Sequence, residues 1–375
     1  MNKIVPAIFV AIVIVIAVIF FRPQPHKVQT NFGNSSYYMT AAGAGIGMAQ
    51  NQSIRENVLN TLLSTFYDKD TGLFYEFNQN GNFSAEKYNV FGPPYYFKEY
   101  GYDEISGFNA FVGNALLKNA THIADAKNLA DAIHREFLDT KSGSYNILRS
   151  SGDYKGAVND AIIGSFYLEL YEMTGKEKYR EWAKQVFDSI ITNYVSDGKL
   201  NCCIVSGNLS KEMYTRDGLV VASFVYAYRV LGEEKYHETA KKIAENYIAN
   251  YYKIDGYFEK WENAGTDAEI AFGLIELYKI DRDSRYRDIL FSQFKYWSGR
   301  NVGVDPNISV VDEAEQFVFY VKMHELFDGN VFIQSAKSKW ATIENCYSEK
   351  YGFPHVCKGD TYYSTINAIV LLAYV

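Results

Sequence analysis

The sequence has no run of basic residues. Its 37 Lys and Arg are spread among 44 Asp and Glu, and the formal net charge is −7. A nucleic-acid groove needs clustered cations to neutralise phosphates, so this composition excludes nucleic acid as a partner. The chain also has only six His and four Cys, and neither C-x-x-C nor the Cys/His spacing of a zinc site occurs. The sequence therefore predicts no bound metal and no cofactor.

The four cysteines are too few for a disulfide framework. Disulfides form in oxidising compartments, where two cysteines can close a loop. Cys346 and Cys357 would close a loop of modest size and are the favoured pair, with ordinary buried thiols as the alternative. Cys202 and Cys203 stand next to each other, and the sequence assigns them no partner.

An apolar run occupies residues 4–21. As a helix it would be roughly 27 Å long, close to the thickness of a bilayer core. No small-residue cleavage site precedes Arg22, so an uncleaved transmembrane anchor is predicted rather than a cleaved signal peptide. Residues 22–52 contain Pro23, Pro25 and a small-residue stretch and are predicted to form a tether, which leaves residues 53–375 for the folded domain.

Acceptor sequences for N-glycosylation are more frequent than chance would supply. Each predicts a modified surface position if the domain lies outside the cell. Together with the anchor they favour an extracytoplasmic, membrane-anchored glycoprotein. The six sequons begin at Asn34, Asn51, Asn82, Asn119, Asn208 and Asn307.

One pattern is repeated along the chain. Residues Asp160, Gly175 and Tyr179 recur 57 positions later without a gap, and a third copy keeps the separation of 19 residues between its first and last members. Repeats of this length are stacked supersecondary units. The later members are Asp217, Gly232 and Tyr236, then Asp267 and Tyr286.

Two kinds of helix alternate in this repeat. Helices that are apolar on nearly all sides must be buried, whereas amphipathic helices show one face to water. Six inner helices enclosed by six outer ones satisfy both kinds, so we predict an all-α ring of six helical hairpins. Its long connections all lead from an outer to an inner helix, so they gather at the end where the inner helices begin. The predicted inner helices are 108–118, 157–173, 216–231, 267–280, 312–327 and 361–375, and the outer ones are 53–66, 123–137, 179–194, 235–251, 286–297 and 331–343.

These features resemble the six-hairpin, or (α/α)6 toroid, superfamily of glycosidases and related sugar enzymes. The resemblance covers nearly all of residues 53–375. It implies an (α/α)6 toroid fold, a poly- or oligosaccharide substrate, and carboxyl groups that act at the beginnings of inner helices or in the adjoining loops. Its carriers are NDAIIGSFYLELYEMTGKEKY (159–179), RDGLVVASFVYAYRVLGEEKY (216–236), TDAEIAFGLIELYKIDRDSRY (266–286) and the Gly-aromatic units at 72–75, 143–145 and 256–258.

Acidic residues open five of the predicted inner helices, and Asn109 takes this place in the first. Capping explains them without any function, because Asp and Asn satisfy free N–H groups and complement the helix dipole. Glycoside cleavage, however, needs one protonated and one ionised carboxyl group. The acids that open the helices are Asp160, Asp217, Asp267, Asp312 and Asp360.

Asp160 and Asp217 are the first catalytic candidates, because Asn159 and Arg216 give them polar partners ahead of an apolar helix. Asp267 and Glu269 are the next candidates. The sequence also predicts substrate contacts by polar groups at the same end and by aromatic rings able to stack on sugars. These contacts are Asn159, Arg216, Asp312, His355, Asp360, Tyr95, Tyr96, Tyr257, Trp261 and Tyr362.

The chain departs from the narrower families of this superfamily. It lacks the Asp-Asp pair followed by aromatic residues of mannan-degrading relatives and the Trp-rich Gly-Asn-Gly segment of unsaturated uronyl hydrolases. Only His355 among the histidines is placed to reach the cleft, which disfavours an epimerase with two His bases. Two hypotheses remain: a membrane-tethered, extracytoplasmic glycoside hydrolase or related carbohydrate-active enzyme, and a non-catalytic toroid that binds glycan or protein at the cell surface.

Overall fold

The structure, a computed structural model, describes residues 52–75, 77–79, 106–118, 120–149, 151–205, 207–210, 217–253, 255–258, 264–299, 310–348, 354, 357 and 361–363. The chain divides into compact units at residues 1–34 and 35–375, and every described residue belongs to the second. The predicted anchor at 4–21 lies outside the described residues, as does the predicted tether apart from its last residue. No described helix combines the length and hydropathy needed to cross a membrane.

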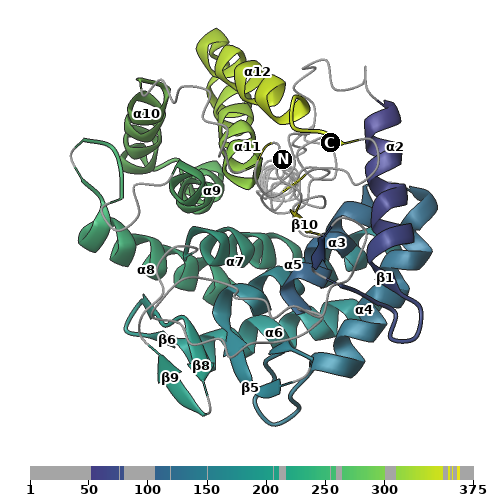
Figure 1. Ribbon diagram of the computed structural model, residues 1–375. Coiled ribbons are helices and arrows are strands. Elements are labelled where there is room, and N and C mark those ends of the chain that lie inside the picture. Colours follow the sequence, from purple (N-terminus) through teal and green to yellow (C-terminus); the bar gives the residue numbers. More distant parts are fainter. Residues whose placement is uncertain are drawn as a thin grey trace, which may run out of the picture. The chain divides into compact units, whose positions relative to one another are not determined.

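Inner and outer helices alternate along the described chain, as predicted. Each inner helix packs against the next one, from α3 to α11, and against the outer helix that follows it (Figure 1). The predicted bounds agree with those observed to within three residues. The inner helices are α3 (Ser106–Leu117), α5 (Ala157–Thr174), α7 (Asp217–Leu231), α9 (Ala264–Asp281) and α11 (Val310–Phe327). The outer helices are α2 (Gln52–Thr61), continued by the π-helix η2 (Leu62–Phe66), α4 (Ile123–Phe137), preceded by the 3-10 turn η3 (Ala120–His122), α6 (Glu177–Tyr194), α8 (Glu234–Tyr251), α10 (Ser284–Gly299) and α12 (Asn330–Glu344).

The turns from inner to outer helices share one conformation. Gly175, Gly232, Arg282 and Asp328 follow α5, α7, α9 and α11 and have φ of +64°, +74°, +56° and +46°. The N–H of each donates to the carbonyl four residues earlier, which closes the helix with a left-handed residue. These turns are short, so we call this the short-turn end of the ring.

The connections from outer to inner helices contain the described strands, and we call this the long-loop end. All strand pairs are antiparallel. β1 (Tyr67–Asp68) pairs with β2 (Leu73–Phe74), and β6 (Val195–Ser196) pairs with β7 (Lys199–Leu200). A four-stranded sheet has the order β4-β5-β8-β9, formed by Asn146–Leu148, Ser151–Gly156, Cys203–Val205 and Asn208–Ser210.

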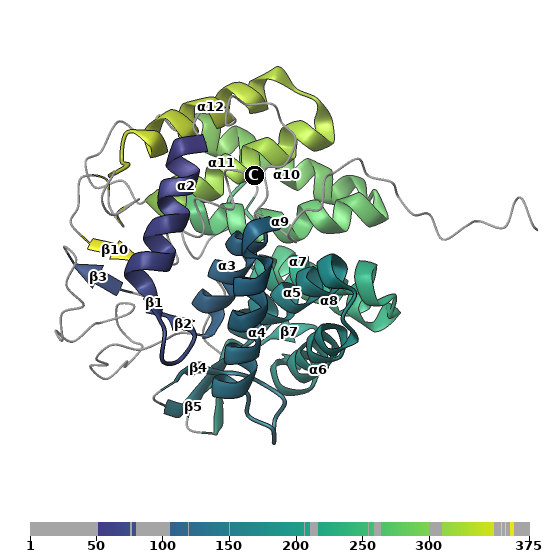
Figure 2. The same ribbon diagram turned by 90° about the vertical axis from the view of Figure 1, so that its right-hand side faces the viewer.

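The predicted last inner helix, 361–375, is wrong at its start. Residues Thr361–Tyr363 form strand β10, which pairs with β3 (Phe77–Gln79) so that Tyr362 stands opposite Asn78. A β-branched residue followed by two aromatic ones favours an extended backbone when an unpaired strand is available. Residues 364–375 lie outside the described residues. The β3–β10 pair joins the connection between η2 and α3 to the last described segment (Figure 2).

Buried charges lie among the inner helices at the short-turn end, although the sequence predicts nearly apolar surfaces there. The Lys118 ammonium pairs with Glu169 of α5, and both side chains are buried. In α7, the Tyr226 hydroxyl donates to Glu172. These contacts join α3, α5 and α7, because a buried polar group must find a partner on a neighbouring helix.

A second group of charges joins α7, α9 and α11 around Glu276. This carboxylate lies 2.7 Å from Lys279 Nζ, 3.7 Å from Lys322 Nζ and 3.8 Å from Arg229 Nη1. Burial would raise the pKa of Glu276, but the charges of Lys279 and Lys322 bring it below its ordinary value. Burial and the neighbouring Lys279 lower the pKa of Lys322 to about 8, against the attraction of Glu276 and Glu325.

Candidate active site

The first turn of α5 connects to two other segments at the long-loop end. Asp160, its fourth residue, is fully buried, and its Oδ1 accepts the backbone N–H of Tyr145 at 3.0 Å. Burial raises the pKa of Asp160 to about 7, opposed by this hydrogen bond. Tyr145 belongs to the Gly-aromatic unit before β4. A carboxyl group in this position fixes the loop and offers no surface to a substrate.

Asn159 joins the same turn to α3. Its Oδ1 accepts the N–H of Gly107 at 2.7 Å and the hydroxyl of Ser106 at 3.0 Å, so one side chain satisfies the N-terminus of the neighbouring helix. Gly107 is required here, because a Cβ at this position would lie 2.5 Å from Asn159 Oδ1. The Asn159 Nδ2 donor is buried and has no hydrogen-bond partner in the described part of the chain.

Asn109 has the same role in α3 that Asp160 has in α5. Its Oδ1 accepts the N–H of Phe74 at 2.7 Å, and its Nδ2 donates to the carbonyl of Phe74 at 3.0 Å. The capping interpretation is therefore wrong for both residues. Each of them is the fourth residue of its helix and not the cap before it, so the polar side chain reaches the preceding hairpin and not its own free N–H groups.

Asp217 and Glu269 lie on adjacent inner helices at the long-loop end. Asp217 is the first residue of α7, and the next residue, Gly218, packs directly against the backbone of α9. A Cβ on Gly218 would lie 2.4 Å from the Glu269 carbonyl oxygen and 2.3 Å from the Ile270 Cα, so only glycine permits this approach. One turn further along α9, a Cβ on Gly273 would lie 2.7 Å from the Gly218 carbonyl oxygen, so glycine is needed there as well. The packing thus sets the backbone of α7 beside Asp217 against the backbone of α9 at Glu269.

The acidic group at the start of α11 is divided between two faces. Glu313 pairs with Lys339 of the outer helix α12 at 2.9 Å, so it faces outward. Asp312 is half-buried and Glu315 is buried. Asp267 is the fourth residue of α9, but its side chain lies outside the described part.

Among the predicted stacking residues, Tyr257 lies against an outer helix. Its ring stacks on Tyr296 of α10, with centroids 4.9 Å apart, so one face is already covered. Tyr362 is in β10, and its side chain is not among those described. The remaining predicted contacts lie outside the described residues: Tyr95, Tyr96, Arg216, Trp261, His355 and Asp360.

Of the four described histidines, only His134 lies at the long-loop end, in the last turn of α4, and it is held by neighbouring rings. His134 of α4 stacks on Trp182 at 3.7 Å and bonds to the Tyr145 hydroxyl, and burial lowers its pKa. His237 bonds to Asp281 at 2.8 Å, and His324 contacts the carbonyl of Gly329 at the short-turn end. Within the described ranges, no group of three or more His, Cys, Asp or Glu is placed to hold a metal ion.

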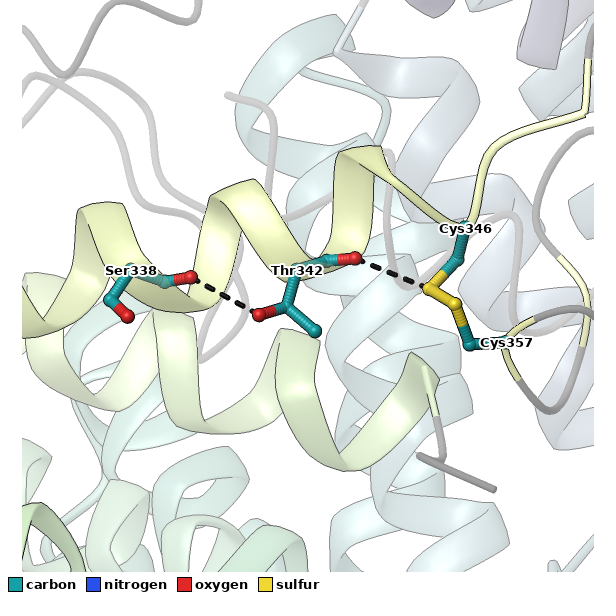
Figure 3. The surroundings of a disulfide bond; sticks show 4 residues. All are labelled: Ser338, Thr342, Cys346 and Cys357. Atoms are coloured by element: carbon teal, nitrogen blue, oxygen red, sulfur yellow. Dashed lines mark hydrogen bonds between the residues drawn. A yellow bond between two sulfur atoms is a disulfide. The ribbon is translucent and has the colours of Figure 1, made fainter. Parts of the chain in front are cut away.

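The predicted disulfide between Cys346 and Cys357 is confirmed. It fastens the end of α12 to the segment before β10, and the Cys346 sulfur lies 3.2 Å from the Thr342 carbonyl oxygen (Figure 3). A second disulfide joins the adjacent residues Cys202 and Cys203. The sequence assigned these two no partner, and their adjacency is the signal that could have indicated the bond.

No protein-family model matches this sequence, and no curated protein matches it. Solved structures do match in fold. A family 76 glycoside hydrolase from a bovine Bacteroides thetaiotaomicron strain has a TM-score of 0.68 and 11% identity over 86% of this chain and 76% of that chain. Cellobiose 2-epimerase from Bacillus thermoamylovorans has a TM-score of 0.68 and 13% identity, over 86% and 99%. An inactive variant of the alpha-1,6-mannanase of Salegentibacter in complex with alpha-1,6-mannotetrose has a TM-score of 0.61 and 12% identity, over 86% and 97%.

The fold is the (α/α)6 toroid. The predicted superfamily resemblance is therefore confirmed at the level of architecture. The similar structures include a hydrolase of glycosidic bonds and an epimerase of a disaccharide, so the fold is compatible with more than one sugar reaction.

Proposed function

We propose that this chain is a carbohydrate-active enzyme that hydrolyses a glycosidic bond at the long-loop end, with Asp217 and Glu269 as the reacting pair. The observation that carries the proposal is the glycine contact between α7 and α9, which sets these two acids on adjacent helices. Glycoside hydrolysis needs two carboxyl groups on either side of one bond. Oligosaccharides are the proposed substrate class, and the similar mannanase is bound to one.

The two acids have different surroundings, which suits different roles. Asp217 is the first residue of α7, where the helix dipole stabilises a negative charge, so we assign it the ionised role of base or nucleophile. Both side chains are buried, Asp217 at 6% and Glu269 at 3% exposure, but Glu269 is the sixth residue of α9 and lies further from the start of its helix. Burial favours the neutral form of a carboxyl group, and the helix dipole opposes this less at Glu269, so Glu269 takes the role of general acid.

Asp160 has a positioning role in this proposal, because its buried carboxyl group holds the loop at Tyr145. Asp267 and Asp312 border the same end and contribute to substrate binding. Hydrolysis is favoured over epimerisation because His122, His237 and His324 lie at the short-turn end, and His134 already bonds to the Tyr145 hydroxyl. Anchoring through residues 4–21, with the domain outside the cytoplasm, is also part of the proposal and is supported by the two disulfides.

A non-catalytic glycan-binding toroid is the second candidate. The observation that favours it is that Asn109 and Asp160, two of the polar residues in the first turns of the inner helices, bind protein backbone. In such a protein the remaining acids would orient a bound sugar and no bond would be cleaved.

The test is turnover of an oligosaccharide panel by the full chain in detergent, with products separated to distinguish cleavage from epimerisation. Asp217→Asn and Glu269→Gln should each lower kcat at least 100-fold, since each removes a group that acts on the transition state. Glu313→Gln is the matched control, because this acid at the same end pairs outward with Lys339. Activity unchanged in both Asp217→Asn and Glu269→Gln refutes the site. Saturable binding without any product supports the glycan-binding alternative.

A further inference from the structure

The Cys202–Cys203 disulfide lies against the first turn of α5. The Cys202 carbonyl accepts the N–H of Ala157, the first residue of α5, at 2.9 Å. Cys203 stands opposite Gly156 in the β5–β8 ladder and opposite Ser210 in the β8–β9 ladder. The two cysteines therefore connect the start of α5 to the sheet at the long-loop end.

The first turn of α5 also hydrogen-bonds to two other segments at the long-loop end. Within four residues it accepts two bonds through Asn159 from α3 and one through Asp160 from Tyr145. A change in the Cys202 backbone therefore acts on the helix that positions two neighbouring segments. The Asn159 Nδ2 donor, buried and without a partner among the described residues, lies in the same turn and would be displaced with it.

A disulfide between adjacent residues is reduced more readily than one between distant residues. A trans peptide fixes adjacent Cα atoms about 3.8 Å apart, below the range of roughly 4.4–6.8 Å that unstrained disulfides span. Cys346 and Cys357, with Cα atoms 4.8 Å apart, lie within that range. Cys202 is half-buried, so a reductant can approach from its side, whereas Cys203 is buried. Exposed or strained disulfides are the labile ones.

We propose that Cys202–Cys203 is a reducible disulfide that controls the long-loop end through the first turn of α5. A dithiol reductant supplies two electrons and two protons: the S–S bond breaks, two thiols form, and the reductant becomes a cyclic disulfide. The peptide between the cysteines, no longer closed in a small ring, rotates, and the Cys202 carbonyl leaves Ala157. The consequence for sugar binding rests on the proposed function, whereas the change at α5 does not.

The experiment compares the full chain in detergent before and after mild treatment with dithiothreitol. Amide hydrogen exchange is followed in the peptide that covers residues 157–160, and binding is measured with the oligosaccharide that the panel above selects. Reduction should speed exchange at Ala157 at least tenfold and weaken sugar binding at least fivefold.

Two variants separate the disulfides. In Cys346→Ser/Cys357→Ser, only the adjacent pair remains, so the full effect of reduction should persist. In Cys202→Ser/Cys203→Ser, exchange at 157–160 should already be fast and dithiothreitol should add nothing there.

Several results would overturn the proposal. They are unchanged exchange at 157–160 after verified reduction of Cys202–Cys203, an effect that disappears in Cys346→Ser/Cys357→Ser, and faster exchange with unchanged sugar affinity. If neither form binds any oligosaccharide, the proposed function fails, and the exchange data alone decide whether the disulfide controls α5.

Discussion

The two ends of the inner helices use polar residues in different ways. At the long-loop end, Asn109 and Asp160 hydrogen-bond to the backbone of a preceding hairpin. Nine residues after each of them, at the short-turn end, Lys118 directly after α3 pairs with Glu169 of α5. The separation is about 2.5 helical turns, or roughly 13 Å. Polar residues at the long-loop end therefore hold the preceding loops in place, and polar residues at the short-turn end hold neighbouring inner helices together.

This difference predicts which substitutions of polar residues each end can tolerate. A side chain that holds backbone is replaceable by any group with the same acceptor, because its partner is an N–H group. A side chain that pairs with another buried charge is not, because removing one partner leaves the other uncompensated. The following predictions test this contrast.

The largest effect is expected from Lys118→Met. It leaves the Glu169 carboxyl buried without its cation and should lower the free energy of unfolding by about 3–5 kcal/mol, as measured by urea denaturation at pH 7. The double variant Lys118→Met/Glu169→Met should recover most of the loss, because neither charge is then buried. Additive losses in the double variant would show that the two residues act independently.

Asp160→Asn should instead stabilise the protein at neutral and alkaline pH. The folded-state pKa of Asp160 is about 7 and its ordinary value is 3.8, so between these pH values the unfolded chain has released the proton and the folded chain still holds it. The free energy of unfolding of the parent therefore falls as pH rises from 3.8 to 7. The asparagine keeps an acceptor for the Tyr145 N–H and has no charge to bury. The gain over the parent should be near zero at pH 4 and on the order of 3 kcal/mol at pH 8. An equal difference at both pH values would contradict this assignment.

Lys322→Met tests the other buried charge group. The pKa of Lys322 is about 8 in the folded chain and 10.5 ordinarily, so the unfolded chain holds the proton more tightly and parent stability rises as pH increases from 8 to 10.5. Methionine removes this penalty, while Lys279 and Arg229 remain beside Glu276. A gain of about 2 kcal/mol is expected at pH 7, disappearing near pH 10.5. Lys322→Arg keeps the charge and should show no gain.

The smallest effect concerns the short turns themselves. Asp328 adopts a φ of +46°, where a side chain is disfavoured, so Asp328→Gly should stabilise the protein by about 0.5–1 kcal/mol. Gly232→Ala is the matched control. A Cβ there meets nothing within 4 Å, so its cost of about 1 kcal/mol would be conformational alone. Thermal unfolding resolves both changes, and a loss of stability in Asp328→Gly would show that its side chain contributes to the turn.

The repeat predicted the helices and the end at which loops gather, because hydrophobic periodicity and a recurring Gly are local signals. It predicted the position of Asp160 but not its partner, because a cap and a contact to a distant hairpin begin with the same residue in the same turn. Residues 361–363 were misassigned for a related reason: an apolar, aromatic run suits either a buried helix or a strand, and the pairing with β3 is not visible locally.

For the candidate site, the sequence named Asp217 and Glu269 but could not show that α7 and α9 pack closely at these residues. The decisive residue is Gly218, whose missing side chain lets α7 approach α9. From the sequence, a glycine inside an inner helix indicates only a weak helix former. The reason for the glycine is the close approach of the α9 backbone, which the sequence does not show. The Cys202–Cys203 bond was missed because adjacent cysteines are usually assigned to separate partners.

The β3–β10 pair has a consequence for how the chain matures. Residues near 78 find their partner near 362, so β3 lacks this partner until residues 361–363 have been synthesised. Contacts of such sequence separation slow folding, because a very large loop must close first. A product terminated before residue 361 would therefore present the unpaired edge of β3 to other chains and aggregate.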